Sequence, residues 1–264
     1  MRVFVEGVGL LGPGLSGWQA GRRVLAGEEA FRFASTIIAA SDLLPPAERR
    51  RTPASVKLAL AVGQEAFQGS GRDAATTATV FTSSSGEAET LHQMCETLAS
   101  AEREVSPTRF HNSVHNAAAG YWSIATRSRE ASTSLCAFDA SFGAGLIEAA
   151  TQMAFRRKPV ALIAYDQPYP EPLHSARPLL ASFGVALVLA HERGVKAFAA
   201  FELTFPTGEE KSTRMSDSAL EELRLGIPAA RALPLLQALA RNKEADVVLD
   251  LPAGKPLRVK VSPC

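Results

Sequence analysis

The segment ASFGAGLIEAATQMAF, residues 140–155, restricts the fold of this chain more than any other stretch. Only Glu148 is charged among its residues, and a helix that is apolar or small on all sides is normally buried. Its glycines and alanines let other elements approach closely. The helix directly follows an expected strand at 132–138, so its first backbone N–H groups and its dipole would favour an anion or a reactive side chain there. The sequence therefore predicts a layered core with this helix inside it.

Strand-like and helix-like segments alternate along the chain, which favours an α/β architecture with right-handed crossovers where strands run parallel. The segment LLPPAERRR (43–51) is interpreted as a loop. No fixed-period repeat or low-complexity linker interrupts the pattern, so residues 1–264 are expected to form a single domain. Hydrophobic periodicity predicts strands at 3–9, 77–85, 132–138, 158–166, 184–191, 196–204, 246–251 and 256–261, and helices at 16–26, 53–68, 86–100, 113–127, 140–156, 216–225 and 230–241.

Composition excludes several classes of protein. The net charge of +1 gives no overall field for nucleic acid or an anionic membrane, and no apolar run is long enough for a transmembrane helix. The start of the chain does not fit a signal peptide, and three widely spaced cysteines make no disulfide framework, so a cytoplasmic location is expected. Three basic clusters are expected to be solvated surface, with a docking patch for an acidic partner as the alternative: Arg22–Arg23, Arg49–Arg50–Arg51 and Arg156–Arg157.

Three motifs suggest chemistry that their context does not support. GVGLLG (7–12) matches a dinucleotide fingerprint, but Pro13 and Gly14 delay the helix, so a structural turn is the preferred interpretation. His111 and His115 are spaced as metal ligands on a helix, yet no third ligand motif accompanies them. TSSSGE (82–87) lacks the elbow of a serine hydrolase. Neither a metal nor a cofactor is therefore expected.

Cys136 lies in the apolar run TSLCAFD, where a free cysteine usually acts as a small buried hydrophobic residue. The functional alternative is a nucleophilic Cys136 assisted by His115 and Asp139, an arrangement that rests only on nearness in sequence. Ser141 is a second candidate nucleophile because it stands at the helix start, where the dipole helps. A serine also needs a base within hydrogen-bond reach, and the sequence identifies none.

The order of these segments resembles the N-terminal half of the β-ketoacyl-acyl-carrier-protein synthases, the condensing enzymes of thiolase fold. Asn116, Gly120 and Ile124 match positions of a family segment, and the resemblance covers about residues 1–200. It implies layered helices and a mixed β-sheet, mainly the N-terminal half of the ketosynthase fold with a truncated C-terminal part. The segments that carry it are VFVEGVGLLGPGLSGWQAGRRVLAGEEAF, TATVFTSSSGEAETLHQMCETL, VSPTRFHNSVHNAAAGYWSIATR and SFGAGLIEAATQMAFRRKPVALIAYD.

The resemblance also implies that the reaction centre is catalytically inactive. With Gly143 placed on the glycine of the family motif, Ala140 takes the position of the nucleophilic cysteine, and a methyl group cannot attack a thioester. Phe142 would crowd the acyl entry, where the family prefers a small residue. The active enzymes carry two histidines in their C-terminal half, whereas this chain has no histidine after residue 200.

The chain is accordingly similar to chain-length-factor-type subunits, which pair with an active ketosynthase, and above all to those of aryl polyene and xanthomonadin-type pigment pathways. The resemblance implies a heterodimer with an active synthase, an acyl carrier protein as second partner, and a shared pocket or interface near Asn116, Trp122, Phe142 and Gly143. The opposing class is a stand-alone acyl-thioester hydrolase or acyltransferase that uses Cys136 or Ser141. A third possibility is a homodimer that holds acyl groups without condensing them.

Overall fold

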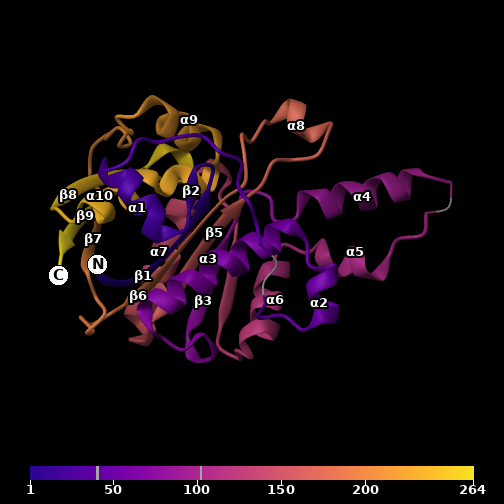
Figure 1. Cartoon of the computed structure of the whole chain (residues 1–264), viewed down its shortest axis with the longest axis horizontal. Helices are drawn as coiled ribbons and strands as arrows, with labels where there is room; N and C mark the ends of the chain where they lie inside the picture. Colours follow the sequence, from indigo (N-terminus) through magenta and orange to yellow (C-terminus); the bar gives the residue numbers. More distant parts are fainter. Residues whose placement is uncertain (40–41, 102) are drawn as a thin grey trace.

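The computed structural model describes residues 1–39, 42–101 and 103–264, and within these ranges nine strands form one mixed sheet (Figure 1). β4 lies at one edge of this sheet and β8 at the other, in the order β4-β3-β5-β6-β1-β7-β9-β8, with the short β2 paired to β1. The strands are β1 (Arg2–Gly12), β2 (Leu15–Ser16), β3 (Ala78–Thr82), β4 (Ser132–Leu135), β5 (Val160–Asp166), β6 (Phe183–Ala190), β7 (Ala199–Thr204), β8 (Ala245–Asp250) and β9 (Pro256–Pro263).

Three neighbouring strands run parallel, and their direction determines at which end of the sheet functional side chains can lie close together. β3 pairs in parallel with both β4 and β5, whereas β6 runs antiparallel to both β5 and β1. The carboxyl ends of β3, β4 and β5 therefore meet at one end of the sheet. The loops that enter these strands meet at the opposite end, together with the loop that leaves β6.

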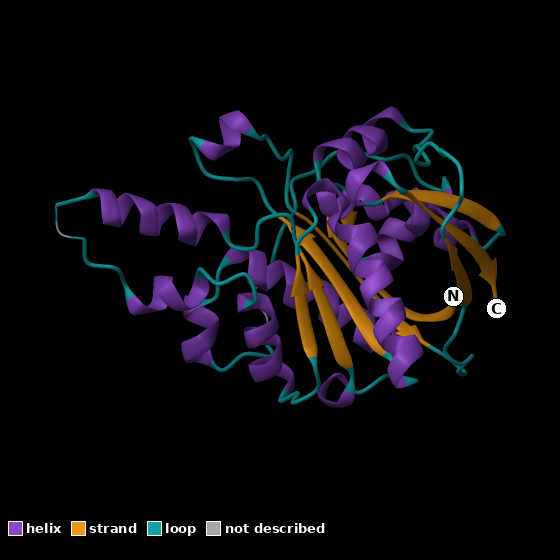
Figure 2. Ribbon diagram, turned by 180° about the vertical axis from the view of Figure 1, so that it is seen from behind, coloured by secondary structure: helices purple, strands orange, loops and turns teal. Residues whose placement is uncertain are grey.

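Helices cover both faces of the sheet, as Figure 2 shows. α3 and α6 pack with the hydrophobic cluster on one face, and α7 and α10 with the cluster on the other. The three strands β7, β9 and β8 continue the sheet from β1, and their apolar residues join the α7 and α10 cluster. The helices are α1 (Trp18–Ala26), α2 (Pro46–Arg51), α3 (Ala54–Ser70), α4 (Ala88–Ala99), α5 (Pro107–Asn112), α6 (Ala117–Thr126), α7 (Ser141–Arg156), α8 (Leu173–Ala176), α9 (Ser218–Gly226) and α10 (Leu233–Arg241).

Gly7 and Gly9 of GVGLLG lie inside β1 and not in the turn expected from the sequence, whereas Gly12 ends β1 next to the turn at Pro13 and Gly14 that leads into β2. A Cβ atom on Gly7 would stand 2.1 Å from the carbonyl oxygen of Ala66, and one on Gly9 would stand 1.9 Å from that of Val62. Both carbonyls belong to α3, so the glycines let this helix pack directly on the central strand. Close packing explains the spacing that resembles a dinucleotide fingerprint.

Helix α7 is buried along its first turns and exposed at its last turn. Phe142 and Leu146 are among the fully buried side chains of the core, in agreement with the expectation for an all-round apolar segment. The expectation fails at Phe155, whose side chain is 90% exposed one residue before the helix ends. The core therefore covers the part of α7 near the carboxyl ends of the parallel strands.

Three local predictions are wrong. LLPPAERRR contains α2, because Pro46 stands in the first turn, where a helix tolerates proline. In place of the expected helix at 113–127, α6 begins only at Ala117, and the separate helix α5 ends at Asn112. His111 therefore lies in α5 and His115 lies between the two helices. β4 ends at Leu135, so the chain leaves the sheet before Cys136.

α4 and α5 form an arm that extends away from the sheet, at the right of Figure 1. Four of the large exposed apolar side chains lie on or next to this arm: Leu91, Leu98, Phe110 and Val114. Among the residues that the structure describes, no helix combines the length and the apolar character needed to cross a membrane.

Candidate functional site

A polar cluster lies where the carboxyl ends of β3, β4 and β5 meet the start of α7. Ser83 and Ser84 follow β3, Cys136 follows β4, and Asp166 is the last residue of β5. The 3-10 turn η2 (Phe138–Ala140) leads from β4 into α7. The short parallel strands bring these residues together although they are far apart in the sequence.

Asp166 is the centre of this cluster and is fully buried. Its Oδ1 accepts hydrogen bonds from the Ser84 backbone N–H and hydroxyl, both at 2.8 Å, and from the Ser83 hydroxyl at 3.2 Å. Its Oδ2 accepts a bond of 2.8 Å from the backbone N–H of Ala229. Burial raises the pKa of Asp166 to about 6, and the hydrogen bonds oppose this rise. Asp166 thus ties the end of β3 to the C-terminal part of the chain.

The turn from β4 into α7 is a strained elbow. Phe138 has a φ of +55°, a left-handed conformation that is unfavourable for a bulky residue, and its side chain is 58% exposed. The Arg177 guanidinium stacks on the Phe138 ring, with its central carbon 3.4 Å from the ring centroid, and forms an ion pair of 2.8 Å with Asp139. A strained strand-to-helix turn is also how some hydrolases present a nucleophile, but here it presents a phenyl ring.

Ala140 and Ser141 stand at the start of α7, as the sequence predicts, and both are buried. The Ser141 hydroxyl donates a hydrogen bond of 2.7 Å to the Phe138 carbonyl and accepts one of 3.0 Å from the Ala137 N–H. It therefore closes the elbow through two local bonds. This engagement does not suit a nucleophile, whose hydroxyl proton must pass to a base.

Cys136 is exposed, so the expectation of a buried strand cysteine is wrong. Its thiol donates a hydrogen bond of 3.1 Å to the carbonyl of Ser84. Asp139, which the sequence suggests as the carboxylate of an arrangement with Cys136 and His115, forms an ion pair with Arg177 instead. The His115 ring lies against the backbone at Gly86, close to the loop that Cys136 contacts. The structure thus brings the thiol and the imidazole to the same loop, but it directs the carboxylate elsewhere.

An open groove of about 550 Å³ lies over the elbow. Its other wall comes from the C-terminal part of the chain, where Arg231 and Asp250 form an ion pair of 3.4 Å. A Cβ atom on Gly143 would stand 2.5 Å from the Asp250 carbonyl oxygen, so this wall packs tightly on the first turn of α7. The lining residues are Ala137, Phe138, Asp139, Ala140, Arg231, Asp250, Leu251, Pro252, Ala253 and Gly254.

The residues expected at a pocket or interface lie in different environments. Asn116 is exposed at the N-cap of α6. Trp122 is buried against the rings of Phe67 and Phe81. Phe142 lies in the first turn of α7, and its side chain is buried in the hydrophobic core. Trp122 and Phe142 therefore shape any site indirectly, through packing. Within the described ranges, no group of three His, Cys, Asp or Glu side chains is arranged to hold a metal ion.

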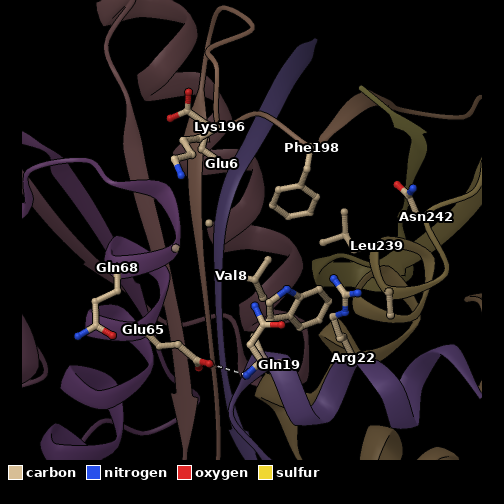
Figure 3. Close-up of a pocket in the computed structure, with 14 residues that line it drawn as sticks. Glu6, Val8, Gln19, Arg22, Glu65, Gln68, Lys196, Phe198, Leu239 and Asn242 are labelled. Carbon is tan, nitrogen blue, oxygen red and sulfur yellow. Dashed lines mark hydrogen bonds between the residues drawn. The ribbon is translucent and has the colours of Figure 1, made fainter. Parts of the chain in front are cut away.

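A second cavity, of about 630 Å³, lies between α1, β1, α3 and α10 (Figure 3). The Glu65 carboxylate reaches across it and accepts hydrogen bonds from the backbone N–H groups of Trp18, at 2.5 Å, and Leu10, at 2.8 Å. Burial raises the pKa of Glu65, and the two backbone bonds oppose this change. The carboxylate thereby caps α1 and fastens it to β1, which is a structural role.

Comparison with known proteins agrees with this fold. Residues 18–248 match the family model described as β-ketoacyl synthase, N-terminal domain. No curated protein matches the chain. The solved structure of the ketosynthase ApeO in complex with its chain length factor ApeC, from Xenorhabdus doucetiae, is similar at 22% identity with a TM-score of 0.72, covering 99% of each chain.

Two further structures show the same likeness at lower identity. The ishigamide ketosynthase/chain length factor has a TM-score of 0.74 at 13% identity, covering 100% of this chain and 99% of that one. A β-ketoacyl synthase from Burkholderia phymatum has a TM-score of 0.72 at 11% identity, with the same coverage. At such identities the likeness establishes the fold, which is the thiolase-like ketosynthase fold expected from the sequence.

Proposed function

Since the chain belongs to the β-ketoacyl synthase N-terminal domain family, we propose that it is a non-catalytic, chain-length-factor-type subunit. It pairs with an active β-ketoacyl-acyl-carrier-protein synthase and shapes the pocket in which a growing acyl chain is held. The pathway we propose is of the aryl polyene type, in which the chain is polyunsaturated. The likeness to a ketosynthase in complex with its chain length factor supports this assignment.

The observation that carries the proposal is the chemistry of the elbow. The residue in the left-handed conformation of the strained turn is Phe138, and the residue at the entry to α7 is Ala140, which we propose stands in place of the nucleophilic cysteine. Neither side chain can attack a thioester. Loss of a covalent nucleophile costs on the order of a millionfold in rate, so the elbow of this subunit acts through its shape.

The pairing surface we propose is the free edge of β4 together with the α4–α5 arm. β4 is the last strand on its side of the sheet, and an unpaired edge strand is a template for pairing with another chain. Its four residues are half-buried or exposed. The arm adds exposed apolar side chains, including Leu91 and Phe110. An active synthase would extend the sheet across this edge and cover the arm.

The opposing function is a stand-alone acyl-thioester hydrolase or acyltransferase. The exposed thiol of Cys136 favours it, because a nucleophile must be accessible. Incubating the chain with acyl thioesters and measuring its intact mass separates the two functions. The proposed subunit stays unmodified, whereas covalent acylation at Cys136 or Ser141 would establish the enzyme.

Co-expression with an active ketosynthase of the aryl polyene type tests the pairing. We expect one complex of both chains on size-exclusion chromatography, and elongation of acyl groups on an acyl carrier protein only when both are present. Phe110→Asp on the arm should abolish co-purification. Phe155→Asp is the matched control, because it places the same charge at an exposed phenylalanine far from the arm. A chain that forms only homodimers, or no complex, would contradict the proposal.

A further inference from the structure

The end of the sheet opposite the candidate site carries a concentration of positive charge. Four connections lie there: α3–β3 (71–77), α6–β4 (127–131), α7–β5 (157–159) and β6–β7 (191–198). They follow the lower border of the molecule in Figure 1. Strand register confirms their nearness, because Thr79 pairs with Ser132, Ala78 with Val160, and Val160 with Leu189. We call this surface, together with the last two residues of α7, the basic end.

Cations outnumber carboxylates at the basic end. The two carboxylates of the last three connections are Glu130 and Glu192. In the α3–β3 connection, Arg72 is paired with Glu6 and stands beside Asp73, so it adds no net charge. The cations of the other connections and of the end of α7 are all exposed, and none has an ion-pair partner among the described residues: Arg127, Arg129, Arg156, Arg157, Lys158, Arg193 and Lys196.

Two apolar side chains project from the same end. Phe155 is 90% exposed and immediately precedes Arg156, Arg157 and Lys158. Val195 is also fully exposed, between Arg193 and Lys196. Both side chains are thus exposed directly beside cations. Trp, Phe and Leu side chains next to Lys and Arg are the combination that inserts into the headgroup region of an anionic membrane.

We infer that the basic end binds the surface of an anionic phospholipid bilayer. The cations meet lipid phosphates, while Phe155 and Val195 enter the boundary between headgroups and acyl chains. The net charge of +1 hides this site because acidic residues elsewhere balance the basic end. Binding is peripheral and does not depend on the proposed pairing with a ketosynthase. Only the α6–β4 connection borders the β4 edge, whereas the α7–β5 and β6–β7 connections belong to strands further inside the sheet.

A membrane fits these observations better than an acidic protein does. The apolar tips project outward, so a folded protein partner would have to supply a pocket for each of them, whereas a bilayer accommodates them without one. The basic end also lies about 24 Å from the elbow, the length of the sixteen residues of α7. A carrier protein that docked there would stand at the wrong end of the helix to serve the groove.

Sedimentation of the full chain with vesicles tests the inference. The probes are vesicles of phosphatidylcholine alone and of phosphatidylcholine mixed with phosphatidylglycerol, at low and high salt. Each Lys or Arg near an anionic surface strengthens binding roughly fivefold, so R156Q/R157Q/K158Q should weaken partitioning on the order of a hundredfold. The matched control R50Q/K211Q/R214Q removes two arginines and one lysine that are exposed in α2 and in the loop before α9, outside the basic end, and should bind like the unmodified chain.

Phe155→Ser separates insertion from charge, because it should weaken binding to the mixed vesicles while leaving the salt dependence intact. Absence of binding to the mixed vesicles, or equal losses in the two triple variants, would overturn the inference. So would capture of a purified acidic carrier protein that R156Q/R157Q/K158Q abolishes while vesicle binding persists, since the surface would then serve a protein. Circular dichroism of each variant confirms that it is folded.

Discussion

Replacing Asp166 by asparagine should destabilise the chain in acid and slightly stabilise it at neutral pH. The carboxyl is buried and connects Ser83, Ser84 and Ala229. Asparagine has nearly the same shape and keeps one oxygen for the serine donors. Its amide NH₂, however, would face the Ala229 backbone N–H, so one buried hydrogen bond is lost and one donor is left unsatisfied. That change costs about 2 kcal/mol of the free energy of unfolding.

The pH dependence follows from the raised pKa of Asp166, about 6 against an ordinary value of 3.8. The folded chain holds this proton more tightly than the unfolded chain does, so the group stabilises the fold fully below pH 3.8 and loses this contribution as pH rises through 6. The difference corresponds to roughly 3 kcal/mol. Asparagine does not titrate. The free energy of unfolding of the unmodified chain minus that of the variant should therefore fall from about 1.5 kcal/mol near pH 4 to about −1 kcal/mol near pH 8.

Urea unfolding of both proteins across this pH range gives the test, because subtracting the two curves cancels the groups they share. We expect the variant to be less stable than the unmodified chain near pH 4 and slightly more stable than it near pH 8. A destabilisation that stays constant or grows toward pH 8 would refute the reasoning. It would mean that the four hydrogen-bond donors stabilise the anion more than burial destabilises it.

Four further substitutions test other parts of the structure. Arg224 donates hydrogen bonds to Glu221 and lowers the pKa of this carboxyl to about 2, so the ionised carboxylate stabilises the fold above pH 4.5 and this contribution is lost as pH falls. Glu221→Gln should therefore lower the free energy of unfolding by on the order of 1 kcal/mol near pH 6 and by less near pH 3, as measured by urea unfolding. In the same assay, Gly143→Ala should lower the free energy of unfolding by about 1–3 kcal/mol, because the new Cβ would overlap the Asp250 carbonyl oxygen. Gly120→Ala should raise it by about 0.5–1 kcal/mol, because no atom lies close to the position of the new Cβ and alanine favours a helix. Arg177→Met removes the stacking on Phe138 and the ion pair with Asp139 and should lower the melting temperature, at a cost of about 1 kcal/mol; unchanged melting would show that the elbow holds without Arg177.

The fold could be predicted from the sequence to a large extent because apolar periodicity reports which face of an element is buried. The α/β pattern, the buried first turns of α7 and the strands at both ends of the chain all follow from such runs. The prolines of LLPPAERRR misled the prediction, since proline breaks a helix interior but also begins a helix. Gly7 and Gly9 misled it in another way, because the approach of α3 to β1 is a tertiary contact that no local pattern encodes.

The candidate site was harder to predict because its geometry depends on a single backbone angle and on contacts between distant segments. Nothing in TSLCAFD indicates that Phe138 takes a positive φ, so the sequence pointed to Ala140 and missed the residue that the elbow exposes. Asp166 was missed for a similar reason. A polar residue at the end of a buried strand is a usable signal, but its partners come from β3 and from the segment near Ala229.

The strained elbow fits the subunit that we propose, which acts by its shape. A left-handed conformation costs about 1–2 kcal/mol for a residue such as phenylalanine and persists only where the surroundings enforce it. Here the Ser141 hydroxyl bonds to the carbonyl of Phe138, and Arg177 covers its ring. The strained residue is Phe138, whose ring cannot attack a substrate, so the strain fixes the direction of α7 and places an aromatic surface at the mouth of the groove. A partner that supplied the nucleophile would therefore meet a rigid wall at this position, and that is the property a subunit needs if it is to limit the space open to an acyl chain.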